Sequence, residues 1–90
     1  MRAALICIDK PNHLQTRIDN RAAHLDHIQS SGIVEMAGPF LDAEGGMIGS
    51  LVILTVESMA QAQDWADADP YAKAGLFESV AIREWKKVVG

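Results

Sequence analysis

This chain has few of the residues that mark several common classes of small protein. It contains one cysteine, Cys7, so no internal disulfide can hold the fold together. Its eight lysine and arginine residues are dispersed apart from Lys86 and Lys87, and its formal net charge is −4, so no basic surface suits a nucleic-acid backbone. The first apolar run stops at Asp9, which is too short for a signal peptide or a membrane span. We therefore expect a soluble, cytoplasmic protein with no nucleic-acid or membrane partner.

The composition is that of a folded protein, because 49% of the residues are hydrophobic and only 22% are charged. Ninety residues predict a single domain that spans positions 1–90. So short a chain buries a smaller fraction of its surface than a longer one does. Contacts with a partner are therefore an expected source of further stability.

The first half of the chain predicts one strand, one helix and a second strand. Residues 2–9 form an apolar run that ends at a turn, which is typical of a strand. Apolar residues spaced by three and four predict a helix over about 19–31, with Gly32 as its stop; they are Ile18, Ala22, Leu25 and Ile28. Residues 33–41 indicate a strand, and Pro39 within it favours an edge position or a bulge.

The second half predicts a strand, a helix and a last strand. A turn over 42–46 leads to residues 48–56, the strongest strand pattern in the chain. Ser58 and Gln61 have the spacing of a capping box that opens a helix. Residues 76–85 then alternate as a strand does.

The order βαββαβ predicts an α+β sandwich of the ferredoxin-like kind, with both helices on one face of a four-stranded sheet. The strand at 48–56 is apolar on both sides, because Leu51 and Ile53 alternate with Val52 and Leu54. We expect a second subunit to cover the free face in a two-fold dimer. A pocket between the first helix and the sheet is then the expected ligand site.

His24 and Asp69 are the candidates for acid/base chemistry. Histidine titrates nearest to neutral pH of all side chains, and His24 lies at the edge of the helical stripe. The alternative is a packing residue that bonds a backbone carbonyl. Asp69 precedes Pro70 and so suits a helix N-cap, but its carboxylate can also accept a hydrogen bond from His24.

The remaining polar residues predict a binding role or none. Arg21, one turn before His24, and Ser50, in the third strand, could hold an oxyanion. His24 and His27 share a helix face, but His27 is expected toward solvent and no Cys or Glu cluster completes a metal site. The glycines at 45 and 46 lie between strands and so form no phosphate cradle. We therefore expect neither a metal nor a cofactor.

Several short motifs together resemble the YciI-like, or YCII-related, family over essentially the whole chain from Ala3. They are Arg21-x-x-His24, Ala37-Gly38-Pro39, Gly49-Ser50, Asp69-Pro70-Tyr71, Ala74-Gly75-Leu76-Phe77 and Trp85. The resemblance implies a ferredoxin-like subunit that forms a dimeric α+β barrel. It also implies that His24 and Asp69 form a dyad in a pocket. One branch of the family removes chloride from a chlorinated hydroxyhydroquinone without a cofactor.

Two hypotheses follow. The first is a cofactor-independent lyase or isomerase that acts on a small molecule, for which an aromatic or quinone-like ring is one option. His24 and Asp69 would be its acid/base residues, and Arg21, Ser50 and Tyr71 would bind the substrate. The second is a non-catalytic dimeric module that binds a small ligand or another protein, with His24 and Asp69 as a structural pair. A cavity that borders His24 would favour the first hypothesis.

Overall fold

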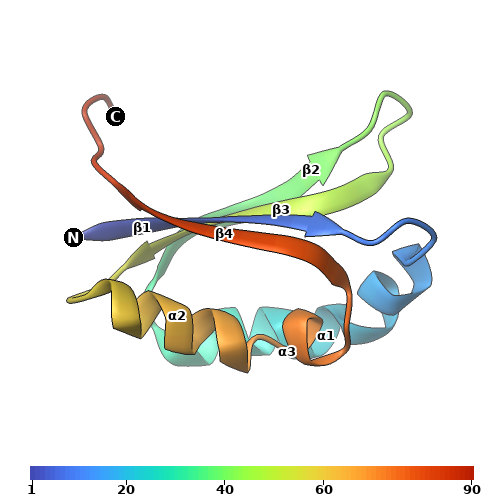
Figure 1. Cartoon of the computed structure of the whole chain (residues 1–90), viewed down its shortest axis with the longest axis horizontal. Helices are drawn as coiled ribbons and strands as arrows, with labels where there is room; N and C mark the ends of the chain where they lie inside the picture. Colours follow the sequence, from blue (N-terminus) through green and yellow to red (C-terminus); the bar gives the residue numbers. More distant parts are fainter.

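The computed structural model describes residues 1–90 as a four-stranded antiparallel sheet with helices on one face (Figure 1). The order of strands across the sheet is β2-β3-β1-β4. The elements are β1 (Arg2–Asp9), α1 (Leu14–Ser31), β2 (Val34–Leu41), β3 (Met47–Thr55), α2 (Met59–Ala68), α3 (Pro70–Lys73) and β4 (Phe77–Trp85). The predicted βαββαβ order is confirmed, with α3 as an additional single turn before the last strand. None of the helices is long and apolar enough to cross a membrane.

The core lies between the sheet and the helices. In antiparallel strands, directly opposite residues point to the same side of the sheet. Leu5 of β1 lies opposite Val52 of β3, and both are buried against the helical layer. From α2, Trp65 packs into the same cluster. Because the strands alternate their side chains, the residues between these face the other way.

The opposite face of the sheet carries no helix (Figure 1). Ile6 and Ile8 of β1 are 36% and 39% exposed there, although both are large apolar side chains. The pairing of β1, β3 and β2 places the side chains of Leu51 and Met36 on the same face of the sheet as Ile6. The prediction that the sheet is apolar on both sides is thus confirmed.

Helix α1 differs from its prediction in both start and orientation. It begins at Leu14 rather than near position 19, and Ile18 and Leu25 are 50% and 48% exposed. Its buried side chains are Arg17 and His24. The expected apolar stripe is therefore wrong, apart from Ile28, which does pack against the core. The helix turns a polar face inward because each of those polar groups has a partner, Arg17 in the sheet and His24 at the N-cap of α3.

Two local predictions are confirmed. Strand β2 is an edge strand, and its register shifts between Phe40 and Leu41, just after Pro39. Ser58 caps α2, because its hydroxyl accepts a hydrogen bond from the Gln61 N–H at 3.1 Å.

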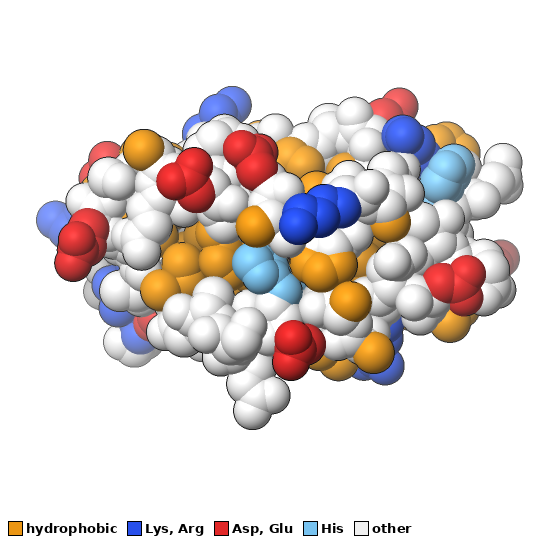
Figure 2. All heavy atoms as spheres, turned by 90° about the horizontal axis from the view of Figure 1, so that it is seen from below, with side chains coloured by type: hydrophobic (Ala, Val, Ile, Leu, Met, Phe, Trp, Pro, Cys, Tyr) orange, Lys and Arg blue, Asp and Glu red, His pale blue; other side chains and the backbone are white.

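The face of the molecule that carries the helices shows acidic and basic side chains scattered among hydrophobic ones (Figure 2). No single sign of charge gathers over it. A ligand that approaches this face therefore meets local side chains rather than a broad field of one charge.

Candidate acid/base site

A cavity of about 160 Å³ lies between α1 and the part of the sheet formed by β2 and β3. Apolar residues of these three elements supply about half of its lining. The polar part of the wall consists of Arg17, Arg21, His24, Ser50 and Tyr71. The expected pocket between the first helix and the sheet is therefore present.

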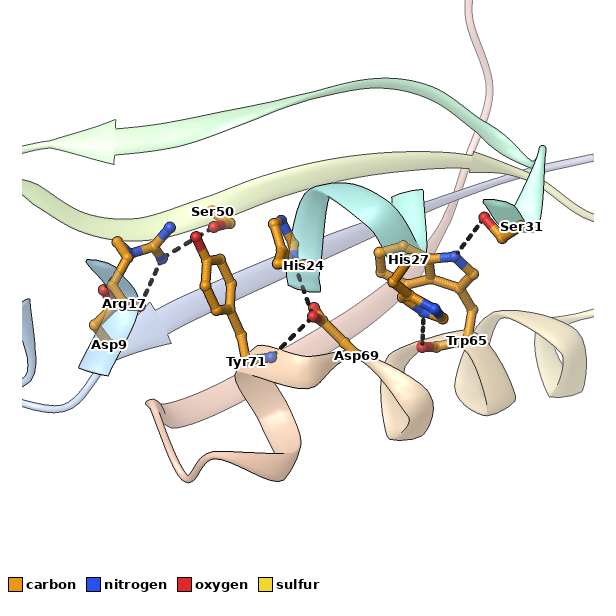
Figure 3. A network of polar contacts seen from close by, with 9 residues as sticks. All are labelled: Asp9, Arg17, His24, His27, Ser31, Ser50, Trp65, Asp69 and Tyr71. Atoms are coloured by element: carbon orange, nitrogen blue, oxygen red, sulfur yellow. Dashed lines mark hydrogen bonds and ion pairs between the residues drawn. The ribbon is translucent and has the colours of Figure 1, made fainter. Parts of the chain in front are cut away.

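His24 and Asp69 form a buried pair at this cavity (Figure 3). The Nδ1 of His24 donates to Oδ1 of Asp69 at 2.8 Å, and the two side chains are only 7% and 2% exposed. The same Oδ1 atom accepts the backbone N–H of Tyr71 at 3.0 Å, which caps α3. Pro70 occupies the first turn of that helix, where its missing N–H costs nothing. Asp69 thus makes both of the contacts that the sequence left as alternatives.

The ring of Tyr71 packs against the face of the His24 imidazole. Its ring stacks on His24 with centroids 3.9 Å apart and planes 13° from parallel. The other neighbours of the ring are Phe77, edge-on at 6.1 Å, and the Arg17 guanidinium carbon, 4.7 Å from the centroid. Burial raises the pKa of the Tyr71 hydroxyl, and the nearby Arg17 charge opposes that rise. The hydroxyl is therefore neutral at physiological pH.

Arg17 is a site residue that the sequence analysis missed. Its side chain is 3% exposed, and its Nε and Nη2 each donate to one carboxylate oxygen of Asp9 at 2.8 Å. Nη2 also donates to the Ser50 hydroxyl at 3.0 Å. Burial acts to lower the pKa of Arg17, but Asp9 outweighs this effect and the net pKa is raised. The guanidinium is a fixed cation held by three bonds.

The spacing of Arg17, Arg21 and His24 could have revealed this residue. Steps of four and three place all three side chains on one face of a helix. Arg21 also lines the cavity, and it makes no ion pair. The structure thus brings together all five of the expected site residues: Arg21, His24, Ser50, Asp69 and Tyr71.

His27 does not point to solvent as expected. Its Nε2 donates to the backbone carbonyl of Trp65 at 3.1 Å, and its ring lies 4.5 Å from the Trp65 ring (Figure 3). Trp65 in turn donates to the Ser31 hydroxyl at 2.9 Å. His27 therefore joins α1 to α2. The rotation of α1 about its axis that buries Arg17 and His24 also places His27 against α2. No group of three or more His, Cys, Asp or Glu residues is arranged to hold a metal ion.

A ferredoxin-like α+β sheet with a buried histidine–aspartate pair beside a small cavity defines a class of protein with a candidate acid/base site. The model of the YCII-related domain matches residues 1–86, and the chain belongs to this family. Protein YciI of Escherichia coli O6:H1 is 40% identical over 89 residues, covering 89% of this chain and 91% of that protein. An uncharacterized protein of Haemophilus influenzae is 37% identical over 89 residues, covering 89% of this chain and 91% of that protein.

Solved structures agree with this assignment. The 5-chloro-2-hydroxyhydroquinone dehydrochlorinase of Burkholderia phenoliruptrix, in complex with 2,5-dihydroxybenzoquinone, superposes with a TM-score of 0.89 and 35% identity. The match covers 96% of this chain and 94% of that one. Rv0793 of Mycobacterium tuberculosis, at 12% identity and a TM-score of 0.62, covers 100% of this chain and 98% of that one and shares the fold. The family and fold expected from the sequence are confirmed.

Proposed function

We propose that this protein is a cofactor-independent acid/base enzyme of the lyase or isomerase type, acting on a small molecule bound in the cavity. His24 is its proton-transfer group, and Asp69 orients the imidazole. The observation that carries the proposal is the 2.8 Å bond from His24 Nδ1 to Asp69, made by a ring that also borders the cavity. A structural pair needs no such opening.

The bond to Asp69 supports Nε2 as the reacting ring nitrogen of His24. A carboxylate can only accept, so the Asp69 bond keeps a proton on Nδ1 of His24. The other nitrogen, Nε2, then carries the lone pair and points away from Asp69 (Figure 3). This is the tautomer that a general base requires.

The proposed step is proton abstraction followed by return of that proton. Nε2 takes a proton from an acidic C–H or O–H, and the electron pair left behind moves onto a substrate oxygen. Asp69 stabilises the imidazolium that forms. In an isomerisation the imidazolium returns the proton to another atom of the substrate. In an elimination from a quinol the imidazolium first returns its proton to the ring carbon that bears the leaving group. Nε2 then takes the proton of a second hydroxyl, the electron pair of that oxygen expels the leaving group, and the imidazolium loses its proton to water. Ser50 and Arg21 are the donors available to the oxyanion.

The dehydrochlorinase complex supports the choice of a substrate class. That protein is 35% identical to this chain and holds 2,5-dihydroxybenzoquinone, a planar ring with several oxygens. A cavity of about 160 Å³ suits a molecule of one ring rather than a polymer. Chlorinated or hydroxylated single-ring quinols are therefore the compounds to assay first.

We further propose that two subunits pair through the free faces of their sheets, in the cytoplasm. Ile6, Ile8 and Leu51 point to the free face of the sheet. They support this pairing, because covering large apolar side chains with a partner lowers the free energy. The cavity lies on the helical side and stays open in such a dimer.

The test is turnover by the wild type and by two substitutions at the pair. With 5-chloro-2-hydroxyhydroquinone as substrate and chloride release as the readout, His24→Ala should lower kcat by about 10²- to 10⁴-fold, the range of general acid/base catalysis. Asp69→Asn should also lower kcat while it keeps the cap of α3, because asparagine caps as well as aspartate. Circular dichroism checks that each variant is folded.

His27→Gln is the matched control, since His27 lies three residues along the same helix but does not border the cavity. It should keep wild-type turnover. Full turnover in His24→Ala would overturn the proposal. A wild-type protein that binds 2,5-dihydroxybenzoquinone but releases no chloride and exchanges no substrate proton with deuterium oxide would support the non-catalytic binding module instead.

A further inference from the structure

A line of three polar side chains leads from the end of β1 to the wall of the cavity. Asp9 holds Arg17 through two bonds of 2.8 Å, and Arg17 donates to Ser50 at 3.0 Å (Figure 3). The charge of Arg17 is matched by Asp9, so Arg17 is not a free cation for a ligand. Holding a buried guanidinium costs desolvation, which the paired carboxylate offsets. The pair holds Arg17 in place beside Ser50.

The bond from Arg17 decides what Ser50 can offer to a ligand. A hydroxyl has one hydrogen to donate and two lone pairs to accept with. The Arg17 donor occupies a lone pair of the Ser50 oxygen, so the hydroxyl hydrogen stays available, and Ser50 lines the cavity. A charge-assisted bond also polarises the hydroxyl that accepts it, which strengthens that hydroxyl as a donor.

We propose that Asp9 and Arg17 are positioning residues that present the Ser50 hydroxyl to an ionised oxygen of the ligand, so that the cavity selects small rings bearing a phenolate or enolate oxygen. This inference rests on the proposed function and names its ligand class. Arg21, which lines the cavity without an ion-pair partner, favours the same negative charge.

The position of Tyr71 places the two ends of such a ligand. Its ring lies between Arg17 and His24, at 4.7 Å from the guanidinium carbon and 3.9 Å from the imidazole centroid (Figure 3). Ser50, which is bonded to Arg17, and His24 both line the one cavity. A single-ring molecule can place an anionic oxygen at Ser50 and its reacting atom at His24.

The experiment compares two probes by isothermal titration calorimetry at pH 7. The probe 2,5-dihydroxybenzoquinone is anionic, and 2,5-dimethoxybenzoquinone has the same ring without an ionisable hydroxyl. Wild type should bind the anionic probe more tightly. Ser50→Ala should weaken that binding by about 10- to 100-fold, as for loss of a bond to a charged group, and should change binding of the neutral probe little. Loss of both probes alike would indicate a merely structural role.

A double-mutant cycle tests whether Asp9 acts through Ser50. Asp9→Asn alone should weaken binding of the anionic probe, and it should cause no further loss when Ser50 is already alanine. Arg17→Lys keeps the charge but lacks the planar guanidinium whose donors reach both Asp9 and Ser50, so it should weaken binding as Asp9→Asn does. It replaces Asp9→Asn in the cycle if that variant does not fold. Equal losses in both backgrounds would overturn the positioning role.

Glu35→Gln is the control, because it removes the carboxylate of a separate ion pair, with Arg2, that lies away from the cavity. It should bind both probes as the wild type does. If wild type binds the neutral probe as tightly as the anionic one, or binds neither, the ligand class proposed here is wrong. That outcome leaves the turnover test of His24 unaffected, so the two proposals fail separately.

Discussion

Burial of the single thiol gives this protein a measurable response to alkaline pH. Burial, with a smaller contribution from Asp69, raises the pKa of Cys7 from 9.0 to about 12. The folded state thus favours the neutral thiol, and its contribution to stability is complete below the unfolded pKa near 9. That contribution is lost as the pH rises from there through the folded pKa.

We therefore expect the free energy of unfolding to fall above about pH 9, with Cys7 contributing up to about 1.4 kcal/mol per pH unit. Urea denaturation of wild type and Cys7→Ala at several pH values up to about 11 measures the two slopes. The slope should be smaller in Cys7→Ala, although Tyr71, whose pKa is also raised, keeps a slope of the same sign. Parallel curves would contradict the raised pKa.

At the same scale, the sequence displays the polar side chains of the cavity region unequally well. His24 and Asp69 each sit in a local pattern, the helix and the Asp-Pro cap, that the sequence displays. Arg17 shares a helix face with His24 by its spacing, but a charged residue in a helix is nearly always exposed, so that spacing alone was a weak signal. Its partner Asp9 belongs to a strand, and Ser50 is 33 positions away, so only the folded chain brings them together.

Among the elements, α2 depends on a cap that the sequence made visible. The Ser58 hydroxyl accepts the Gln61 N–H at 3.1 Å, and the Gln61 side chain accepts the Glu57 N–H at 2.8 Å. Ser58→Ala should lower the free energy of unfolding by about 0.5–2 kcal/mol, as measured for other N-caps. Chemical denaturation checks this value. Ser58→Asp, which restores an acceptor, should recover most of the loss, and a destabilised Ser58→Asp would argue against capping.

Helix α1 shows where prediction of an element reached its limit. The existence and end of the helix followed from spacing and from Gly32, which has a φ of +69°. Its orientation did not, because burial of apolar area is the usual driving force and here polar contacts replace it. Arg17 faces inward because it bonds Asp9 and Ser50. His24 faces inward because it bonds Asp69. Hydrophobic spacing alone carries no information about such partners.

At the scale of the whole molecule, the βαββαβ order was predictable because alternation and turn residues agreed along the chain. What covers the free face of the sheet was inferred only from its apolar side chains. The contact between subunits depends on the side chains of two chains, so the pattern of one chain indicates the apolar face and not what packs on it. Substitutions on that face supply the missing observation.

Ile8→Glu should convert the proposed dimer to a monomer, because a charge on the free face would be buried without a partner. Size-exclusion chromatography with light scattering measures the mass at micromolar concentration. Ile18→Glu is the matched control, since Ile18 is a comparably exposed isoleucine on α1, in the opposite layer. It should leave the mass unchanged. Equal masses for Ile8→Glu and wild type would place the interface elsewhere.

The sheet also works as a partition. Side chains of one parity, such as Ser50 and Val52, belong to the cavity, and those of the other parity, such as Leu51, belong to the free face. Neighbouring positions in one strand therefore serve different surfaces. A family that keeps this arrangement can exchange its assembly partners through one set of positions and its substrates through the other, each with little disturbance of its counterpart.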